Sequence, residues 1–559
     1  MIRTFDTHKI RKSEELSQSL WDFATLPEKG ESVSMKAAVP SCWETYPDTI
    51  TYRGKACYER SFSAEGNICL KFKGVSHTAE VYLDGKLIKR HYNAYTPFEA
   101  AAQGLAAGEH RLRVVVDNSF GEESALHVPN DYQTYGGITR AVVLERLTDV
   151  YVSKLHFTPV RGDGQWRGIV SLDLKNLAKS DFKGTVEVFL GERRILEKSV
   201  GISGGGEFSL VSEELSCGDA ESWSPGHPTL YTLTAVLRDE NGEPVDDLID
   251  RVGFREVKVK GKDILLNGEK LHIKGFCRHE DHPQFGCSLP YSAMYQDLLL
   301  MKDMGANSVR TSHYPNDEIF LDLCDESGIL VWEENHARGL SEQDMRNPNF
   351  ERQCEDCIRE MIEAHYNHPS IYIWGILNEC ASHTEYGREC YRKQFELIES
   401  LDRSRPHSFA SCQFKKDISF GLPDVVSYNI YPQWYHDTPA DEYLRDLYQW
   451  IQTDTEGAGK PFLITETGAG AIYGYRTPAK VKWSEEYQAE ALKRQLTAVL
   501  GMEECSGVYI WQFCDCRVCD SWFHVRPRTM NNKGIVDEYR RPKLAYEVVK
   551  SIFRESGGE

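Results

Sequence analysis

The chain is organised around a stretch near its middle, Ile371-Tyr372-Ile373-Trp374-Gly375-Ile376-Leu377-Asn378-Glu379. Its β-branched, aromatic and aliphatic residues form a short apolar run, which is typical of a strand buried on both faces. The run ends on an amide and a carboxylate, so Asn378 and Glu379 are predicted to lie at the tip of that strand. Glu379 could instead cap the following helix, and one Asn-Glu pair alone does not decide between these roles.

A second stretch has the same design, Phe462-Leu463-Ile464-Thr465-Glu466. It is again short and apolar and again ends on a carboxylate, 87 positions after the first (466 − 379). In a parallel barrel the carboxyl ends of all strands open onto one face, so Glu379 and Glu466 can meet across its mouth. Two such carboxyl groups are the equipment that cleavage of a glycosidic bond requires.

Residues 259–559 alternate between apolar strands and segments of helical periodicity, such as 294–301 and 487–496. Eight alternations in about 300 residues predict a catalytic (β/α)8 TIM barrel. The eight strand candidates are 271–276, 308–313, 329–334, 371–377, 408–413, 425–431, 462–466 and 507–513.

The residues before the barrel show short alternating segments that end at Gly, Asn and Asp. Residues 1–150 are predicted to form an antiparallel β-sandwich, in which Asp84-Gly85 makes a hairpin turn of the favoured type. Residues 151–258, with alternating runs at 169–174, 184–190 and 231–237, are predicted to form an immunoglobulin-like β-sandwich. The fold class is therefore multidomain: two β-sandwiches and a barrel.

Composition excludes several classes of function. The 559 residues include 65 basic and 85 acidic ones, and the net charge of −20 opposes binding to nucleic acid or to an anionic membrane. No run of about 18 apolar residues and no N-terminal leader is present, so we expect a cytoplasmic protein unless a signal peptide has been removed. The 16 cysteines lack the spacing of a disulfide framework. Pairs such as Cys354 and Cys357 resemble half a zinc site, but no second pair accompanies them, so buried thiols are favoured.

The two glutamates can divide the work of glycoside hydrolysis between them. One carboxyl must be protonated to supply a proton to the leaving oxygen, while the other must be ionised beneath the developing oxocarbenium ion. We assign Glu379 as acid/base and Glu466 as nucleophile. Asn378 could bind the 2-hydroxyl of the sugar, and the phenol of Tyr431 could orient the nucleophile.

Several of these motifs resemble glycoside hydrolase family 2. The segments that carry the resemblance in the barrel are 276–282, 375–379 and 464–468, and those similar to the family's sugar-binding domain are 39–44, 72–75, 95–98 and 136–140. The resemblance covers the whole chain. It implies a jelly-roll-like domain, an immunoglobulin-like domain and a catalytic barrel that retains the anomeric configuration.

The resemblance also suggests which sugar is bound. Asn531 and Lys533 are similar to the Asn-x-Lys motif by which the β-glucuronidases of this family hold the substrate carboxylate, although Asn-Asn-Lys-Gly would otherwise be read as a surface turn. Asp131 matches a residue that reaches from the sandwich to the sugar's 4-hydroxyl. The remaining matches to pocket residues of the family are His313, Tyr435 and Trp511. Of these, His313 and Tyr435 could equally be packing at the rim of the barrel.

The expected activity is that of a retaining exo-β-glucuronidase acting on a small-molecule or glycan glucuronide, with no cofactor and no catalytic metal. Glu280 and His282 could still be metal ligands, because galactosidases of the family use a metal ion. The segment 336–350 is short, which implies an open entrance to the active site that admits bulky aglycones. We expect a homo-oligomer with no nucleic-acid or membrane partner. The alternatives are a β-galactosidase or β-galacturonidase of the family, or a non-catalytic carbohydrate-binding protein.

Overall fold

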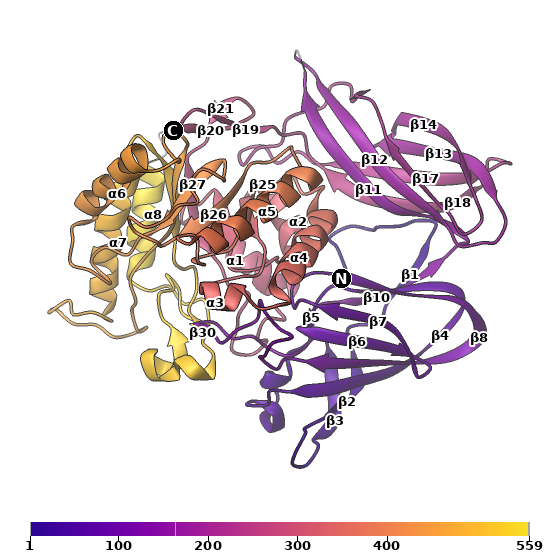
Figure 1. Cartoon of the computed structure of the whole chain (residues 1–559), viewed down its shortest axis with the longest axis horizontal. Helices are drawn as coiled ribbons and strands as arrows, with labels where there is room; N and C mark the ends of the chain where they lie inside the picture. The colour runs from indigo at the N-terminus through magenta and orange to yellow at the C-terminus, as the bar shows by residue number, and fades with distance from the viewer. Residues whose placement is uncertain (1, 163, 557–559) are drawn as a thin grey trace.

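The computed structural model describes residues 2–162 and 164–556, which form two β-sandwiches and a closed barrel (Figure 1). In Figure 1 the indigo N-terminal sandwich and the magenta second sandwich lie on the same side of the orange and yellow barrel. The predicted fold class is confirmed. The domain boundaries 1–150, 151–258 and 259–559 stay predictions.

The N-terminal sandwich is built from one sheet of eight strands in the order β1-β10-β4-β8-β6-β7, with β2 pairing with β3 and β4. Because β4 and β8 have 18 and 20 residues, they are long enough for the sheet to bend over a core that includes Trp21, Tyr58 and Phe72. The bounds of its elements are β1 Lys12–Glu15, β2 Ser19–Thr25, β3 Ser34–Val39, η1 Trp43–Thr45, η2 Pro47–Thr49, β4 Lys55–Phe72, β6 Thr78–Leu83, β7 Lys86–Tyr92, β8 Phe98–Asp117 and β10 Val142–Leu147. A short pair, β5 Val75–Ser76 and β9 Gly137–Ile138, lies outside this sheet.

The predicted hairpin turn joins β6 to β7. Asp84 and Gly85 have φ angles of 50° and 82°. Positive φ at both central residues is the conformation that matches the twist of the flanking strands, and it is why an Asp-Gly pair is favoured there. This prediction is confirmed.

The second sandwich packs two four-stranded sheets face to face. One contains β11, β12, β15 and β16, and the other has the order β14-β13-β17-β18. Phe157, Leu172 and Val188 lie in the core between them. The predicted runs 169–174, 184–190 and 231–237 lie inside β12, β13 and β17. The strands are β11 Val150–Arg161, β12 Trp166–Asn176, β13 Phe182–Leu190, β14 Arg193–Ile202, β15 Glu207–Val211, β16 Leu215–Ser216, β17 Tyr231–Asp239 and β18 Pro244–Val252.

The barrel closes through parallel pairing of eight strands, with β22 bonded to β29. All eight predicted strands are present: β22 Ile273–Cys277, β23 Ser308–Thr311, β24 Leu330–Glu334, β25 Ile371–Ile376, β26 His407–Ser411, β27 Val425–Asn429, β28 Phe462–Thr467 and β29 Cys505–Ile510. The last strand ends three residues before its predicted end at 513. After Ile510 the backbone turns to a different partner, because the amide of Gln512 donates to the carbonyl of Lys533 at 3.1 Å.

Helices surround the barrel, as Figure 1 shows. Their bounds are α1 Tyr291–Asp303, α2 Glu318–Ser327, α3 Glu342–Met345, α4 Phe350–His365, α5 Glu385–Leu401, α6 Ala440–Asp454, α7 Glu485–Leu500 and α8 Ala545–Glu555. The small sheet of β19 Val257–Lys260, β20 Asp263–Leu266 and β21 Glu269–Lys270 belongs to the same apolar cluster as Ile273, Leu330 and Leu463. Beyond β29 the chain forms β30 Cys516–Arg517, η3 Asp520–Val525, η4 Pro527–Thr529 and β31 Met530–Asn531.

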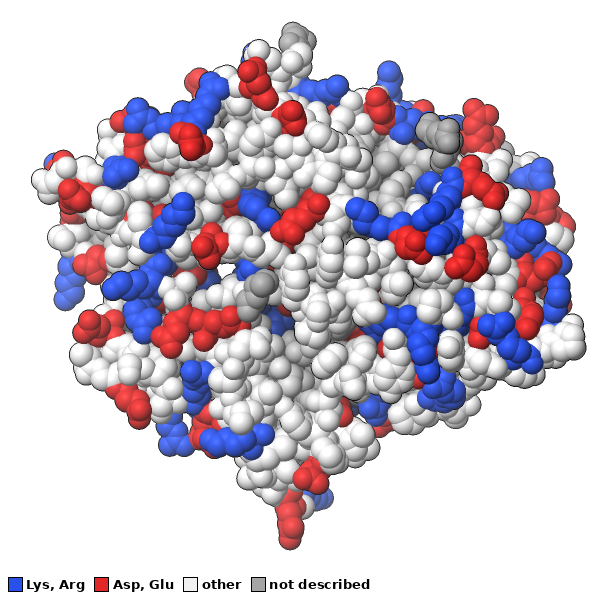
Figure 2. Space-filling view, turned by 180° about the vertical axis from the view of Figure 1, so that it is seen from behind, with Lys and Arg blue, Asp and Glu red and all other residues white. Residues whose placement is uncertain are grey.

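The N-terminal segment ties the three parts together. Arg3 donates to Asp322 of α2 at 2.7 Å, and the carbonyl of Thr7 accepts from Ile249 of β18. Arg11 binds Asp246 of the second sandwich and Glu145 of the first, both at 2.8 Å. Basic and acidic side chains are interspersed over the face drawn in Figure 2. Among the described helices, none is long and apolar enough to cross a membrane.

Candidate active site

A cavity of about 480 Å³ opens at the carboxyl ends of the barrel strands, where the two glutamates lie. Its wall contains seven of the ten predicted site residues, namely Asp131, Glu379, Tyr431, Tyr435, Glu466, Trp511 and Lys533. The other lining residues are Arg338, Cys412, Asn429, His436, Tyr443, Trp522, Val525 and Arg526. The three predicted residues outside this wall are Asn378, His313 and Asn531. Asn378 and Asn531 form hydrogen bonds to residues of the wall, and Nε2 of His313 lies 3.9 Å from Glu466.

Glu466, at the end of β28, is held by a cation and a phenol. Nη1 of Arg310 lies 3.0 Å from Oε1 of Glu466, and Tyr431 donates to Oε2 at 2.6 Å. Burial, followed by the negative charge of Glu379, raises the pKa of Glu466 to about 7, against the opposing effects of Arg310 and Tyr431. The glutamate pair therefore holds a proton near neutral pH.

Glu379 follows β25 on a turn of unusual backbone. Leu377 and Glu379 have φ angles of 41° and 55°, values that residues other than glycine adopt rarely and often at functional sites. Nδ2 of Asn429 contacts both Oδ1 of Asn378 and Oε1 of Glu379, at 3.1 and 3.0 Å. Asn429 thus fixes the amide and the carboxylate relative to each other. Nδ2 of Asn378 has no hydrogen-bond partner among the described residues and is free to meet a ligand.

Arg310 connects Glu466 to Asn378, the residue that precedes Glu379. Its side chain, fully buried at the end of β23, binds Glu334 through Nε and Nη2, each at 3.0 Å, and Oδ1 of Asn378 at 2.8 Å. The same guanidinium binds Glu466. The sequence did not predict this role of Arg310, since its partners come from three other strands.

Asp131 reaches the pocket from the N-terminal sandwich. Arg338 and Arg526 lie 3.4 and 3.0 Å from its carboxylate, and Asn531 donates to it at 3.2 Å. Burial alone would raise the pKa of Asp131, but the charges of Arg338, Arg526 and Lys533 outweigh burial and lower it to about 2. Asp131 is therefore an anion. Arg338 also lies 3.6 Å from Oε2 of Glu379, so it bridges the sandwich and the catalytic pair.

Lys533 is a buried cation in an aromatic setting. It is 3% exposed, and its Nζ lies 3.0 Å from the hydroxyl of Tyr435 and 5.2 to 5.6 Å from the ring centroids of Tyr431, Trp434 and Tyr435. Among the described residues Lys533 has no ion pair, and it acts on the Asp131 anion only at longer range. A buried charge without a counter-ion is unfavourable, so the site is prepared for an anion.

His313 and Trp511 form one side of the pocket floor. Their rings stack with centroids 5.0 Å apart, and Nδ1 of His313 lies 2.9 Å from Glu334. Burial and the charge of Arg310 hold the pKa of His313 well below its usual range. A neutral ring that donates from Nδ1 to Glu334 leaves Nε2, which lies 3.9 Å from Glu466, as an acceptor.

Arg526 and Arg528, two positions apart, have different partners. Arg526 binds Asp131 in the pocket, whereas Arg528 pairs with Glu538 at 2.6 Å. Arg338 gave no local signal, because it lies in an irregular segment after β24. Asn429 lies within the predicted strand 425–431, but nothing in that pattern indicated its partners.

Among the described residues, one group has the geometry to hold a metal ion, and it consists of Asp322, Asp325 and His368. These carboxylates already have protein partners, because Arg3 binds Asp322 and His368 binds Asp325 at 2.6 Å. Glu280, which the sequence offered as a possible metal ligand, accepts a hydrogen bond from Arg140 at 2.8 Å.

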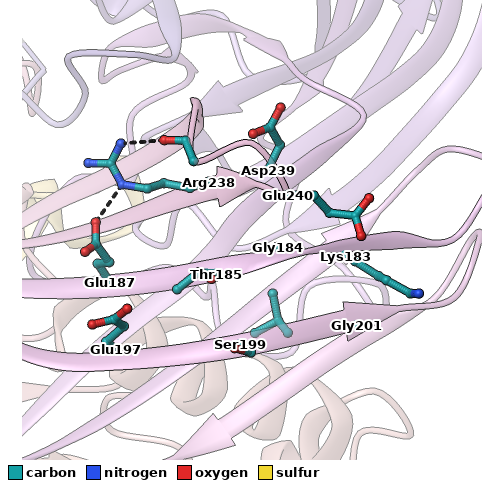
Figure 3. A pocket seen from close by; sticks show the side chains of 12 residues that line it. Lys183, Gly184, Thr185, Glu187, Glu197, Ser199, Gly201, Arg238, Asp239 and Glu240 are labelled. Carbon is teal, nitrogen blue, oxygen red and sulfur yellow. Dashed lines mark hydrogen bonds and ion pairs between the residues drawn. The ribbon is translucent and has the colours of Figure 1, made fainter.

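A second hollow, of about 680 Å³, lies on the β14-β13-β17 face of the second sandwich (Figure 3). Figure 3 shows charged side chains along this face, and Arg238 donates to Glu187 at 2.6 Å. It contains none of the predicted site residues and has no aromatic side chain in its lining.

Comparison with known families matches all three domains of the chain. The family models described as glycosyl hydrolases family 2 match over residues 32–148 for the sugar binding domain, 150–255 for the second domain and 257–556 for the TIM barrel domain. The chain belongs to glycosyl hydrolase family 2. The resemblance drawn from the sequence motifs is thereby confirmed, and this family 2 chain is a glycoside hydrolase.

Several similar proteins are described as uronidases, although a β-galactosidase from Thermoanaerobacterium thermosulfurigenes is also 30% identical over 536 residues. A β-glucuronidase from Paenibacillus borealis is 29% identical over 542 residues, which cover 90% of this chain and 88% of the relative. The structure of a β-galacturonidase from Eisenbergiella tayi bound to galacturonate is 66% identical, with a TM-score of 0.98 and full coverage of both chains. A Bifidobacterium dentium β-glucuronidase in complex with coumarin-3-O-glucuronide is 27% identical, with a TM-score of 0.87 and coverage of 99% and 98%.

Proposed function

We propose that this family 2 enzyme is a retaining exo-β-uronidase that removes a terminal β-linked hexuronate, with β-D-glucuronides among its substrates. The observation that carries the proposal is Lys533, a cation that is 3% exposed and has no carboxylate partner in the described chain. The carboxylate of a uronate supplies the missing charge, and a charge-assisted hydrogen bond to it is of the stronger kind. A neutral hexose would leave Lys533 buried and uncompensated.

The catalytic cycle begins with the proton that the glutamate pair shares. Arg310 and Tyr431 bind Glu466 directly, at 3.0 and 2.6 Å, whereas Glu379 accepts from the neutral amide of Asn429 and has the Arg338 cation at the longer distance of 3.6 Å. These contacts favour placing the proton on Glu379 and the charge on Glu466. Glu466 then attacks the anomeric carbon while Glu379 protonates the departing oxygen, which leaves a glycosyl ester on Glu466.

In the second step the roles reverse. Glu379, now a carboxylate, takes a proton from water, and the hydroxide attacks the anomeric carbon and releases Glu466. Nδ2 of Asn378, which has no partner among the described residues, is placed to bind the 2-hydroxyl as positive charge develops on the sugar. Both steps displace at the same carbon, so the anomeric configuration is retained.

A second candidate differs only at C4 of the sugar. The 66% identity to a β-galacturonidase favours β-D-galacturonides, whereas the relatives at 27 to 29% identity are β-glucuronidases. Asp131 is the residue expected to meet the 4-hydroxyl, and its anionic state allows it to accept from either epimer. The galacturonide is therefore the first alternative sugar to assay.

The test compares four aryl β-glycosides with one leaving group: glucuronide, galacturonide, glucoside and galactoside. We expect kcat/KM for at least one uronide to exceed that of its neutral counterpart by 100-fold or more, on the order of the difference that leaving a site's polar group unpaired produces. Equal rates on the acid and neutral sugars would refute the uronidase assignment. Absence of turnover on all four would favour the non-catalytic carbohydrate-binding alternative.

We further propose that the enzyme works in the cytoplasm. All 16 cysteines are free and all but three are buried, which suits a reducing compartment. Assembly as a homo-oligomer stays a prediction. Cell fractionation and light scattering of the purified protein test these two points.

A further inference from the structure

The loop 531–534, which carries Asn531 and Lys533, is fixed mainly by side chains that never reach the cavity. It begins at the last residue of β31 and carries the side chains proposed to bind the uronate. The amide of Ala471 donates to the carbonyl of Asn532 at 2.8 Å, and Gln488 donates to the carbonyl of Gly534 at 3.0 Å. These bonds hold the backbone of the loop from two sides.

Lys543 binds this loop from within the protein. Its side chain is 0% exposed, and its Nζ reaches three oxygens: Asp515 at 2.7 Å, the carbonyl of Ala471 at 2.7 Å and the carbonyl of Asn532 at 3.2 Å. An ammonium has three N–H donors, so each one has an acceptor. The lysine therefore joins the loop to the segment after β28.

Asp515, the ion-pair partner of Lys543, binds the same loop. Its side chain is also 0% exposed, and it accepts from the amide of Gly534 at 2.8 Å and from Nδ2 of Asn532 at 3.1 Å. Gly534 has no room for a side chain, because a Cβ there would lie 2.3 Å from the amide nitrogen of Asp515. The residues before and after Lys533 are thus both tied to this ion pair.

We propose that Lys543 and Asp515 form a positioning pair that sets the enzyme's selectivity for acidic over neutral sugars. This inference rests on the proposed uronidase function. Lys533 itself has one polar side-chain contact in the described chain, with Tyr435, which is 60% exposed. The place of its ammonium therefore depends on the backbone that Lys543 and Asp515 hold.

The geometry explains why a buried ion pair is used at this position. A site that recognises a carboxylate has to be held to within about 0.5 Å by groups behind it. Lys543 and Asp515 touch neither the cavity nor the glutamates, so they act on specificity through Asn532 and Gly534. Loosening the loop displaces Lys533 and Asn531 while leaving Glu379, Glu466 and Arg310 in place.

The decisive variant is the double substitution Lys543→Met with Asp515→Leu. Replacing a buried ion pair by apolar side chains of similar volume often leaves a protein folded, whereas removal of one partner strands a buried charge. The readout is kcat/KM on an aryl uronide divided by kcat/KM on the matching neutral glycoside. We expect this ratio to fall at least 10-fold, chiefly through a higher KM for the uronide, with little change on the neutral sugar.

A matched control is a second buried ion pair outside the site, Arg405 with Asp402, which lies before β26 at the opposite end of the barrel. The double substitution Arg405→Met with Asp402→Leu should leave the selectivity ratio unchanged, whatever it does to stability. Direct binding of free hexuronate and hexose, measured by calorimetry, should show the same loss of preference in the Lys543/Asp515 variant.

The outcomes are distinguishable. A wild-type enzyme without preference for uronides would refute the proposed function itself. A wild type that prefers uronides, together with a folded Lys543/Asp515 variant that keeps its ratio, would overturn only the positioning role. Equal losses on both sugars in that variant would also overturn it, because they would show general support of the fold.

Discussion

The hydroxyl of Tyr431 donates a 2.6 Å hydrogen bond to Oε2 of Glu466, on the side opposite the bond from Arg310. Tyr431 comes from the segment after β27 and Glu466 from the end of β28, so the contact joins neighbouring strands of the barrel. It orients the carboxylate and stabilises its charged form, as a nucleophile requires.

Replacing Tyr431 by Phe removes this donor and keeps the ring. A hydrogen bond to a charged group contributes about 1.5 to 3 kcal/mol, so we expect kcat/KM to fall about 10- to 100-fold. The bond lowers the pKa of Glu466, and its loss should raise that pKa above about 7 and move the acidic limb of the pH–rate profile to higher pH. Profiles of kcat/KM for both enzymes test this, and an unmoved limb would contradict it.

Replacing Glu466 by Gln should abolish turnover, because an amide cannot attack the anomeric carbon. In the unmodified enzyme, a 2-fluoro uronide with a good leaving group should leave a glycosyl ester on the peptide that contains Glu466, which mass spectrometry detects. An ester on another residue, or near-normal turnover by the variant, would refute the assignment of the nucleophile.

Replacing Glu379 by Ala tests the acid/base role through the leaving group. An acid is needed most when the departing oxygen is basic, so the variant should lose several-fold more activity on alkyl uronides than on nitrophenyl uronides. Measuring kcat/KM across leaving groups of increasing pKa should give a steeper dependence than in the unmodified enzyme. The same dependence in both enzymes would place the acid elsewhere.

Replacing Lys533 by Ala should lower kcat/KM for uronides alone. Loss of a charge-assisted hydrogen bond raises the barrier for uronides by about 1.5 to 3 kcal/mol. Neutral glycosides do not use the ammonium, and their kcat/KM should hold. Losses of similar size on both classes would mean that Lys533 supports the fold rather than the carboxylate.

The parts of the site that could be predicted are those written in a few consecutive residues. Glu379 and Glu466 each end an apolar strand, and the topology of a parallel barrel brings strand ends together. Lys533 and Asp131 were reached only through the family resemblance, since a turn-like Asn-Asn-Lys-Gly and a polar loop carry no such signal. The barrel strands themselves followed from apolar runs of the expected length.

The residues that were missed depend on contacts made only after the domains close. Arg338 lies in an irregular segment, and its partners Asp131 and Glu379 are 207 and 41 positions away (338 − 131 and 379 − 338). Local pattern carries no information on such pairs. The same holds for the buried imidazoles of His77, His127 and His336, which come from two strand-end segments and a loop.

These three imidazoles predict how stability depends on pH. Their rings stack between the N-terminal sandwich and the barrel, with centroids 4.5 Å apart for His77 and His127 and 4.2 Å for His127 and His336. Burial lowers the pKa of His77 to about 4 and that of His336 to about 3, and it holds the pKa of His127 well below its usual range. All three are therefore neutral in the folded enzyme at neutral pH.

Because these folded pKa values lie below those of the unfolded chain, the unfolded state binds more protons as soon as the pH drops below about 6.5. The contribution of these imidazoles is complete above that pH and is lost as the pH falls from about 6.5 through the folded pKa values of about 4 for His77 and about 3 for His336, by at most about 1.4 kcal/mol per pH unit for each imidazole. His127→Gln removes one such group, so the slope of the unfolding free energy against pH in this window should become shallower by about one proton. Denaturant unfolding at pH 7.5, 6 and 5 measures the slope. The control is His227→Gln, at a side chain that is 69% exposed, which should leave the slope unchanged; equal slopes in all three proteins would show that carboxylates alone set the acid sensitivity.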